Sequence, residues 1–200
     1  MDEYQREDLT PKKRKNPIAS FFELFRYTLI ALAIVFVVRT YIAQPFIVDG
    51  SSMYPTFEDK QYLIVDEISY RFEDPQRGDV IIFRYPKNPS AFYIKRVIGL
   101  PGETVTIISG KVMIKNSEYP DGFYIEEPYI NEMDLNDNLT RILEEDEYFV
   151  MGDNRNFSSD SRHWGNVPRE NIVGTPLFRL FPVDSISIKP GDYEVLTLEN

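Results

Sequence analysis

The stretch "FYIKRVIGLPGE", residues 92–103, decides the fold class of this chain. Its first part is rich in aromatic and β-branched residues, and a Gly-Leu-Pro-Gly sequence closes it, which is the pattern of a strand followed by a turn. Alternate residues of a strand point to opposite faces. Lys95 and Arg96 therefore lie on different faces, and one of the two cations must point into an apolar layer or a cleft.

Similar short segments lie on both sides of this strand. They are residues 46–50, 61–69, 79–85, 104–109, 111–116, 147–152, 171–182 and 185–189. Gly, Pro, Asp and Asn divide them, and "SGK" at 109–111 predicts a tight hairpin. The sequence predicts a mainly β domain with antiparallel sheets over residues 44–200, in which the acidic segment 117–146 is a less regular insertion.

The N-terminal part follows a different pattern. Residues 27–38 are apolar or weakly polar without a charge, and aromatic and aliphatic residues extend this run on both sides. A cleaved signal peptide is disfavoured because bulky Tyr41 and Pro45 lie where small residues are needed, and a buried soluble helix fits poorly behind "KKRK" at 12–15. We expect a single transmembrane helix at 18–43 that tethers the β domain. The positive-inside rule then places residues 1–17 in the cytoplasm, as a basic tail, and the β domain outside.

Composition excludes several classes of function. The net charge of the chain is −10, and residues 46–200 carry fifteen basic and twenty-seven acidic residues, so a nucleic-acid partner is not expected. The chain has no cysteine and one histidine, which removes disulfides and thiolate chemistry and leaves an ordinary zinc site without ligands. We expect neither a metal nor a cofactor.

Two adjacent serines in "DGSSMYPT", residues 49–56, raise the question of a nucleophile. A serine hydroxyl needs a neighbouring base. His163 is the one histidine, and a Ser-His-Asp triad stays open, although nothing around His163 favours it. Lys95 is the other candidate, because a partly buried lysine without a carboxylate neighbour loses its proton more easily than one in water.

Four segments, in this order, resemble the motifs of type I signal peptidases. They are "SMYPT" (52–56), "RGDVIIF" (77–83), "YIKRVIGLPGE" (93–103) and "MGDNRNFSSDSRHWG" (151–165). The resemblance covers about residues 20–182, including the expected anchor. It implies a membrane-bound serine endopeptidase that removes signal peptides from exported preproteins at the outer face of the cell membrane.

The resemblance also implies roles for single residues. Ser52 would be the nucleophile and Lys95 the general base, while Ser158 would orient Lys95. Asp160 and Arg162 would form a supporting ion pair. Ser51 would be a neighbour whose side chain points elsewhere.

One position departs from the family pattern. Some members have a serine two residues before the nucleophile, and its hydroxyl helps to bind the oxyanion, whereas this chain has Gly50. The oxyanion region, Gly50 and Ser52, is then left with the backbone N–H of Ser52 and a second donor from elsewhere or from water. We expect backbone geometry or Ser51 to compensate. Substrate-pocket residues implied by the resemblance are Met53, Phe57, Tyr93 and Ile94.

The expected partners are preproteins with signal peptides, the lipid bilayer and the protein translocation machinery. Two alternatives stay open. One is a catalytically inactive, membrane-anchored β module for assembly or adhesion, and the other is a repressor-like, self-cleaving Ser-Lys peptidase. The second alternative needs a DNA-binding segment, and this chain has the expected anchor in its place.

Overall fold

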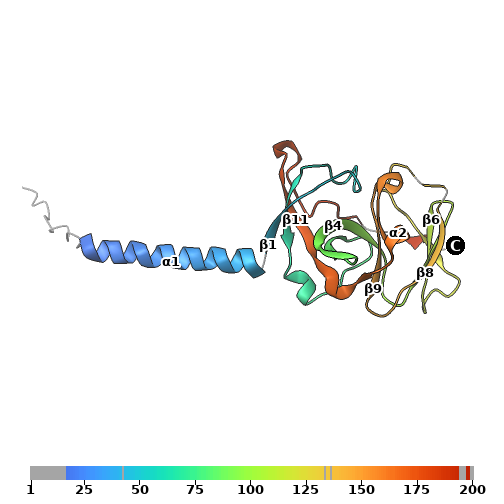
Figure 1. Cartoon of the computed structure of the whole chain (residues 1–200), viewed down its shortest axis with the longest axis horizontal. Helices are drawn as coiled ribbons and strands as arrows, with labels where there is room; N and C mark the ends of the chain where they lie inside the picture. The colour runs from blue at the N-terminus through green and yellow to red at the C-terminus, as the bar shows by residue number, and fades with distance from the viewer. Residues whose placement is uncertain (1–16, 42, 133, 136, 194–196, 199–200) are drawn as a thin grey trace, which may run out of the picture. The chain divides into compact units, whose positions relative to one another are not determined.

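The computed structural model describes residues 17–41, 43–132, 134–135, 137–193 and 197–198. It divides the chain into two compact units, residues 1–39 and 40–200. The first unit holds most of helix α1, Pro17–Tyr41, and the second holds the β-strands (Figure 1). Pro17 suits the first position of a helix, where its missing N–H has no intrahelical partner to lose.

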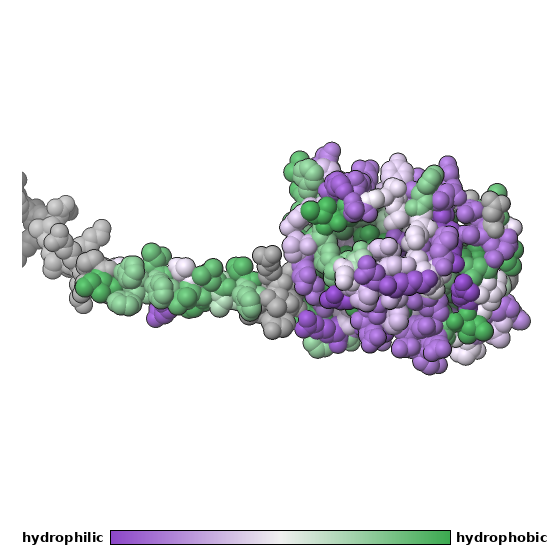
Figure 2. Space-filling view, viewed as in Figure 1, coloured by the Kyte–Doolittle hydropathy of each residue, from purple (hydrophilic) through white to green (hydrophobic). Residues whose placement is uncertain are grey.

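Helix α1 exposes its apolar side chains. Among them are Ile18, Phe21, Phe22, Leu24, Phe25, Leu29, Ile30, Leu32, Ile34, Val35 and Phe36. In Figure 2 the helix is largely green, whereas purple residues dominate the visible face of the second unit. Within the described part of the chain, no helix combines the length and hydropathy that a membrane crossing requires. The anchor at 18–43 therefore stays a prediction, and the predicted tail lies outside the described residues except for Pro17.

The second unit contains two antiparallel sheets within the described residues, and the prediction of a mainly β fold is confirmed. The first sheet has the order β1-β2-β11-β3-β4-β9-β10, and β12 pairs with β11. Its strands are β1 (Ala43–Ile47), β2 (Tyr62–Asp66), β3 (Val80–Tyr85), β4 (Asn88–Gly99), β9 (Glu147–Met151), β10 (Val167–Pro168), β11 (Ile172–Phe181) and β12 (Ser187–Ile188).

The second sheet has the order β13-β7-β6-β5-β8. Its strands are β5 (Thr104–Ile108), β6 (Lys111–Lys115), β7 (Phe123–Ile125), β8 (Asn138–Ile142) and β13 (Thr197–Leu198). The predicted hairpin joins β5 to β6, where Ser109 and Gly110 both have positive φ. The insertion expected at 117–146 is more regular than predicted, because β7 and β8 lie in it. In Figure 1, β6 and β8 lie at the end of this unit away from β1 and β11.

Short helical turns complete the unit. They are η1 (Ser69–Arg71), η2 (Arg155–Phe157), α2 (Ser161–Trp164), η3 (Arg169–Asn171) and η4 (Val183–Ser185). Both η2 and α2 follow β9 directly in the chain, and β9 pairs with β4. The last residues of β9 lead into the loop 152–162, which we call the site loop. This pairing brings the site loop beside the strand that carries Lys95.

The core explains why β4 is central. Val97 and Ile98, which point to opposite faces of β4, are both fully buried and belong to two different apolar clusters. Burial on both faces allows a strand to carry a continuous apolar run, as the second half of β4 does. Any cation in this part of the strand is therefore withdrawn from water.

Candidate active site

A tight turn presents Ser52. Gly50, with φ of +91°, reverses the chain after β1, and backbone hydrogen bonds from Tyr54 to Ser51 (3.1 Å) and from Phe57 to Met53 (2.9 Å) continue the turn. Only glycine adopts such a φ without steric cost. Met53 and Phe57 are 1% and 0% exposed, so the residues after Ser52 are fastened in the core. The turn is thus held on both sides of the serine.

The site loop holds the same turn from outside. The backbone N–H of Asn154 donates to the carbonyl of Ser52 at 3.1 Å, and its side-chain amide donates to the carbonyl of Ser51 at 3.0 Å. Two segments that are about 100 positions apart in the sequence are thereby joined at the serine.

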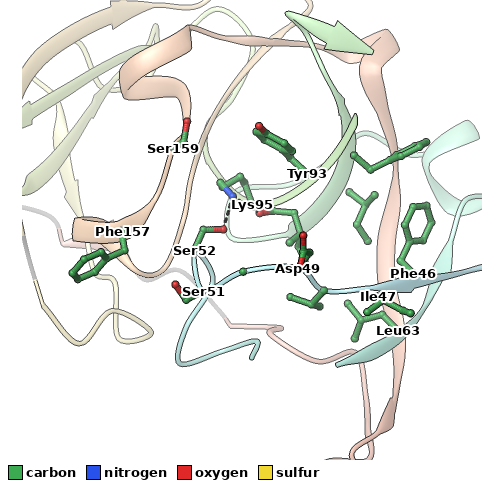
Figure 3. Close-up of a pocket in the computed structure, with 15 residues that line it drawn as sticks. Phe46, Ile47, Asp49, Ser51, Ser52, Leu63, Tyr93, Lys95, Phe157 and Ser159 are labelled. Carbon is green, nitrogen blue, oxygen red and sulfur yellow. Dashed lines mark hydrogen bonds between the residues drawn. The ribbon is translucent and has the colours of Figure 1, made fainter. Parts of the chain in front are cut away.

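The amine of Lys95 lies against the Ser52 hydroxyl. Its Nζ donates to Oγ of Ser52 at 2.6 Å and to the carbonyl of Ile94 at 2.8 Å, and Lys95 is 4% exposed. Figure 3 shows the Ser52 hydroxyl turned toward Lys95, while the side chain of Ser51 points away. The structure therefore brings together the predicted nucleophile and the predicted base.

Burial lowers the pKa of Lys95 to about 8, because the charged amine loses its hydration. The negative charges of Asp160 and Asp153 act in the opposite direction and limit the shift. Among the described residues, no ion pair includes Lys95. Roughly one molecule in ten then carries a neutral amine at pH 7.

The predicted ion pair of Asp160 and Arg162 is present. Nε and Nη2 of Arg162 donate to the two carboxylate oxygens at 2.8 and 2.9 Å, and both side chains are buried. Burial opposes the charge of Asp160, but Arg162 and the N–H of Gly152, which donates at 3.0 Å, hold the pKa of Asp160 below its usual value. Asp160 also caps α2 by accepting from the backbone N–H of Arg162.

Ser158 is buried and lies beside Gly152, the first residue of the site loop. A Cβ added to Gly152 would come within 2.2 Å of the Ser158 hydroxyl and 2.3 Å of the Ser52 carbonyl. The Ser158 hydroxyl is buried, and no hydrogen bond between described residues joins it to Lys95. Its role in orienting the amine stays a prediction.

A second buried ion pair, which sequence reasoning missed, lies on the other face of β4. Arg96 and Asp153 have fully buried side chains joined by two hydrogen bonds of 2.9 and 2.7 Å. Thr56 also donates to Asp153, at 2.5 Å. The adjacent positions of Lys95 and Arg96 in a predicted strand indicated that one cation lies on each face of the strand. They could not indicate the partner of Arg96, which lies 57 positions away.

Of the two backbone N–H groups in the predicted oxyanion region, those of Gly50 and Ser52, one already has a hydrogen-bond partner. The N–H of Gly50 is engaged by Asp59 at 2.8 Å, whereas no hydrogen bond between described residues uses the N–H of Ser52. A Cβ on Gly50 would meet nothing within 4 Å. The Ser52 N–H is thus available to a ligand, and a second donor at this position stays a prediction.

A pocket of about 400 Å³ opens beside Ser52 and Lys95. Ser52, Lys95, Tyr93 and Ile94 line it together with apolar residues of β1, β2 and β3: Phe46, Ile47, Leu63 and Ile82. Figure 3 shows Phe46, Ile47 and Leu63 grouped on one side of the pocket and Phe157 on the other.

Two of the predicted pocket residues need correction. Met53 and Phe57 do not line the pocket but pack with Val48, Leu63 and Val80 in a buried cluster beneath it. The turn after Ser52 directs both side chains inward, which a motif in the sequence cannot reveal. Tyr93 and Ile94 line the pocket, and their role in binding substrate stays a prediction.

The other candidate groups lie apart from this arrangement. His163 has a side chain that is 62% exposed, and its nearest acidic group is Asp160, at 4.0 Å. Among the described residues, no group of three or more His, Cys, Asp or Glu is placed to hold a metal ion. The geometry therefore offers a serine hydroxyl, an amine of lowered pKa and a backbone N–H that has no partner among the described residues, which are the parts that acyl transfer needs.

An antiparallel β domain with a serine hydroxyl beside a buried lysine amine has the arrangement that a serine–lysine hydrolase requires. The family model described as "Signal peptidase, peptidase S26" matches residues 21–181. The chain belongs to this signal peptidase family, and it is a peptidase.

Two relatives agree with this assignment. The chain is 34% identical over 192 residues to the "Probable signal peptidase I-2" of Synechocystis sp. (strain ATCC 27184 / PCC 6803 / Kazusa), covering 94% of this chain and 85% of the relative. It is 42% identical over 156 residues to the "Signal peptidase I" of Leptolyngbya laminosa, covering 74% of each. A crystal structure of a signal peptidase I from Enterococcus faecalis V583 is 31% identical, with a TM-score of 0.43, and the match covers 52% of this chain and 97% of that one.

Proposed function

We propose that Ser52 and Lys95 form the catalytic dyad of a signal peptidase that cleaves signal peptides from preproteins. The observation that carries this proposal is the 2.6 Å contact between a buried amine and a serine hydroxyl. A general base must lie within hydrogen-bond reach of the proton that it removes and must have a pKa near the working pH. Lys95 meets both conditions, with a pKa of about 8.

The reaction follows from these groups. The neutral amine takes the hydroxyl proton as Oγ of Ser52 attacks the scissile carbonyl carbon, and the Ser52 N–H stabilises the negative oxygen that forms. The C–N bond then breaks, and Lys95 gives its proton to the leaving amine. A water molecule attacks the resulting ester, loses its proton to Lys95, and releases the signal peptide as Ser52 recovers that proton.

The pocket supports a substrate that binds as an extended strand. Phe46, Ile47, Leu63 and Ile82 give the pocket an apolar wall, and polar residues also line it: Asp49, Ser51, Ser52, Lys95 and Ser159. We expect small apolar side chains of the substrate, just before the scissile bond, to lie against the apolar wall. We expect a preprotein with Ala at position −1 to be cleaved and one with Leu there to resist cleavage. Equal cleavage of the two would contradict a pocket that selects small residues.

We also propose that residues 18–43 anchor the enzyme in the membrane, with residues 1–17 in the cytoplasm and residues 44–200 outside. The exposed apolar side chains of α1 and the basic residues 12–15 support this topology. Protease added to intact spheroplasts should digest the β domain of the full-length protein. Protection of the β domain until the membrane is opened would overturn this topology.

The decisive experiment compares cleavage of a preprotein by the full-length protein and by the Ser52→Ala and Lys95→Ala variants. Loss of the amine or the hydroxyl should each lower kcat by at least about 100-fold, because both act in one proton transfer. If both variants cleave the preprotein as fast as wild type does, Ser52 and Lys95 are not the catalytic residues. An inactive wild type would favour the inactive β module.

A further inference from the structure

The acidic segment 117–146 contacts the site loop through several side chains. Glu127 pairs with Arg155, Glu132 accepts from Asn156 at 3.2 Å, and Asp137 pairs with Arg162. All of these site-loop residues lie within the stretch that carries Ser158 and Asp160. The segment is thus not only an excursion between strands but a neighbour of the catalytic machinery.

The pair of Glu127 and Arg155 is the most buried of these contacts. The two side chains are 4% and 2% exposed, and the guanidinium holds both carboxylate oxygens, with Nη1 at 2.9 Å from Oε2. The hydroxyl of Tyr129 also donates to Glu127, at 2.9 Å. Such bidentate pairing fixes the direction of the guanidinium as well as its distance.

The guanidinium of Arg155 also contacts Gly152. Nε of Arg155 donates to the Gly152 carbonyl at 3.1 Å, while the Gly152 N–H donates to Asp160 at 3.0 Å. The α-carbon of Gly152 leaves no room for a side chain between the Ser158 hydroxyl and the Ser52 carbonyl. Gly152 is therefore the point at which Arg155, Asp160 and the catalytic turn meet.

Arg155 also supports the second arginine of the loop. Its carbonyl accepts from Nη2 of Arg162 at 2.7 Å, and Arg162 in turn holds Asp160. The charge of Asp160 acts on Lys95. The steps from Glu127 through Arg155 and Arg162 to Asp160 are thus hydrogen bonds between buried groups, and the last step, from Asp160 to Lys95, is electrostatic.

We propose that Glu127 is a positioning residue for the dyad, because it orients Arg155 and thereby fixes Gly152 and the site loop against Ser52 and Lys95. This inference rests on the proposed function, since it concerns the geometry of the same dyad. It assigns to the 117–146 segment a role in assembling the active site. Glu127 itself touches neither Ser52 nor Lys95.

The test is a steady-state comparison of full-length wild type, Glu127→Gln and Glu103→Gln on one preprotein substrate. Glu103 is a matched control, because its 6% exposed side chain pairs with Arg77 at 2.7 Å, with no described contact to the site loop. Glu127→Gln should lower kcat by at least about tenfold and change KM by less than about threefold, since small misplacements act on the chemical step. Glu103→Gln should keep kcat while losing thermal stability.

A purely structural role for Glu127 predicts another result. In that case Glu127→Gln would melt at a lower temperature but keep the wild-type kcat per folded molecule, which would overturn the proposal. Wild-type activity and its loss in Ser52→Ala provide the baseline. If that baseline fails, the proposed function is wrong, whereas an unchanged kcat in Glu127→Gln refutes only the positioning role.

Should Glu127→Gln fail to fold, the double variant Glu127→Leu with Arg155→Met decides. Replacing a buried ion pair by apolar residues of similar size removes the unpaired charge and often preserves stability. We expect this variant to fold, and it has no side chain that holds the Gly152 carbonyl. A folded double variant with low kcat supports the proposal, and one with the wild-type kcat overturns it.

Discussion

Lys95 and Arg96 are adjacent on one strand, and both are buried, but they differ in the charge that faces them. Arg96 has a carboxylate, Asp153, in direct contact through two hydrogen bonds. Lys95 has a hydroxyl and a carbonyl within hydrogen-bond distance, and no described ion pair includes it. A paired guanidinium stays charged in the interior, whereas an unpaired amine loses part of its affinity for a proton.

This difference predicts the pH dependence of catalysis. Only the neutral amine can accept the Ser52 proton, and its pKa is about 8, so kcat/KM should rise with pH and reach half of its plateau near pH 8. The measurement is a pH–rate profile between pH 6 and 10 with a peptide substrate. A midpoint near 6.5 would indicate a histidine, and a flat profile would exclude the titrating lysine.

The same burial should cost stability. In the unfolded chain Lys95 titrates near 10.5, so below pH 8 folding must bury a charged amine. The shift corresponds to roughly 3 kcal/mol. Lys95→Met should therefore be more stable than wild type at pH 7, by up to this amount. Its advantage should shrink as the pH rises from 8 to 10.5, as urea unfolding at several pH values can show; a constant difference would contradict the linkage.

Gly152 should not tolerate a side chain. In Gly152→Ala the new methyl group would collide with the Ser158 hydroxyl and with the Ser52 carbonyl, and the second is backbone that cannot rotate away. We expect kcat to fall by at least about 100-fold. Gly165→Ala is the control: its φ of +101° makes alanine strained, but nothing lies within 4 Å of the added Cβ. It should lose about 1–3 kcal/mol of stability and keep its kcat. Equal kcat in both variants would show that Gly152 does not hold the site.

The ion pair behind the dyad should matter for folding. Arg96→Leu leaves the carboxylate of Asp153 buried without its partner, which we expect to cost about 3–5 kcal/mol in the free energy of unfolding. The exposed pair of Arg169 and Asp74 serves for comparison, since Asp74 is 75% exposed. Asp74→Asn should change stability by less than about 1 kcal/mol. Similar effects of the two substitutions in urea unfolding would contradict this ranking.

Ser51 should contribute little to turnover. Its side chain points away from Lys95 in Figure 3, and the carbonyl of Ser51, not its hydroxyl, makes its described contacts. Ser51→Ala should therefore keep kcat within about twofold. A fall of roughly 100-fold, the size expected for the loss of an oxyanion donor, would show that the hydroxyl compensates for Gly50.

Much of the fold follows from local pattern. The alternation in residues 92–100 and the Gly-rich turns predict an antiparallel β domain, and β4 forms from Asn88 to Gly99 as part of one. The motifs around Ser52 and Lys95 indicate both members of the proposed dyad. The residues that line the pocket were harder to predict, because Met53 and Phe57 follow Ser52 in the motif but their side chains point into the core.

By itself, the sequence determined the period of each strand, the residue types able to perform acyl transfer and their order along the chain. These properties depend on neighbours only a few positions apart. Only the tertiary structure decided which side chains meet, such as Lys95 with Ser52, 43 positions away, and Glu127 with Arg155, 28 positions away. Such pairs form because sheet register brings the two residues together and packing withdraws both from water. Neither the register nor the packing is encoded in the alternation of a single segment.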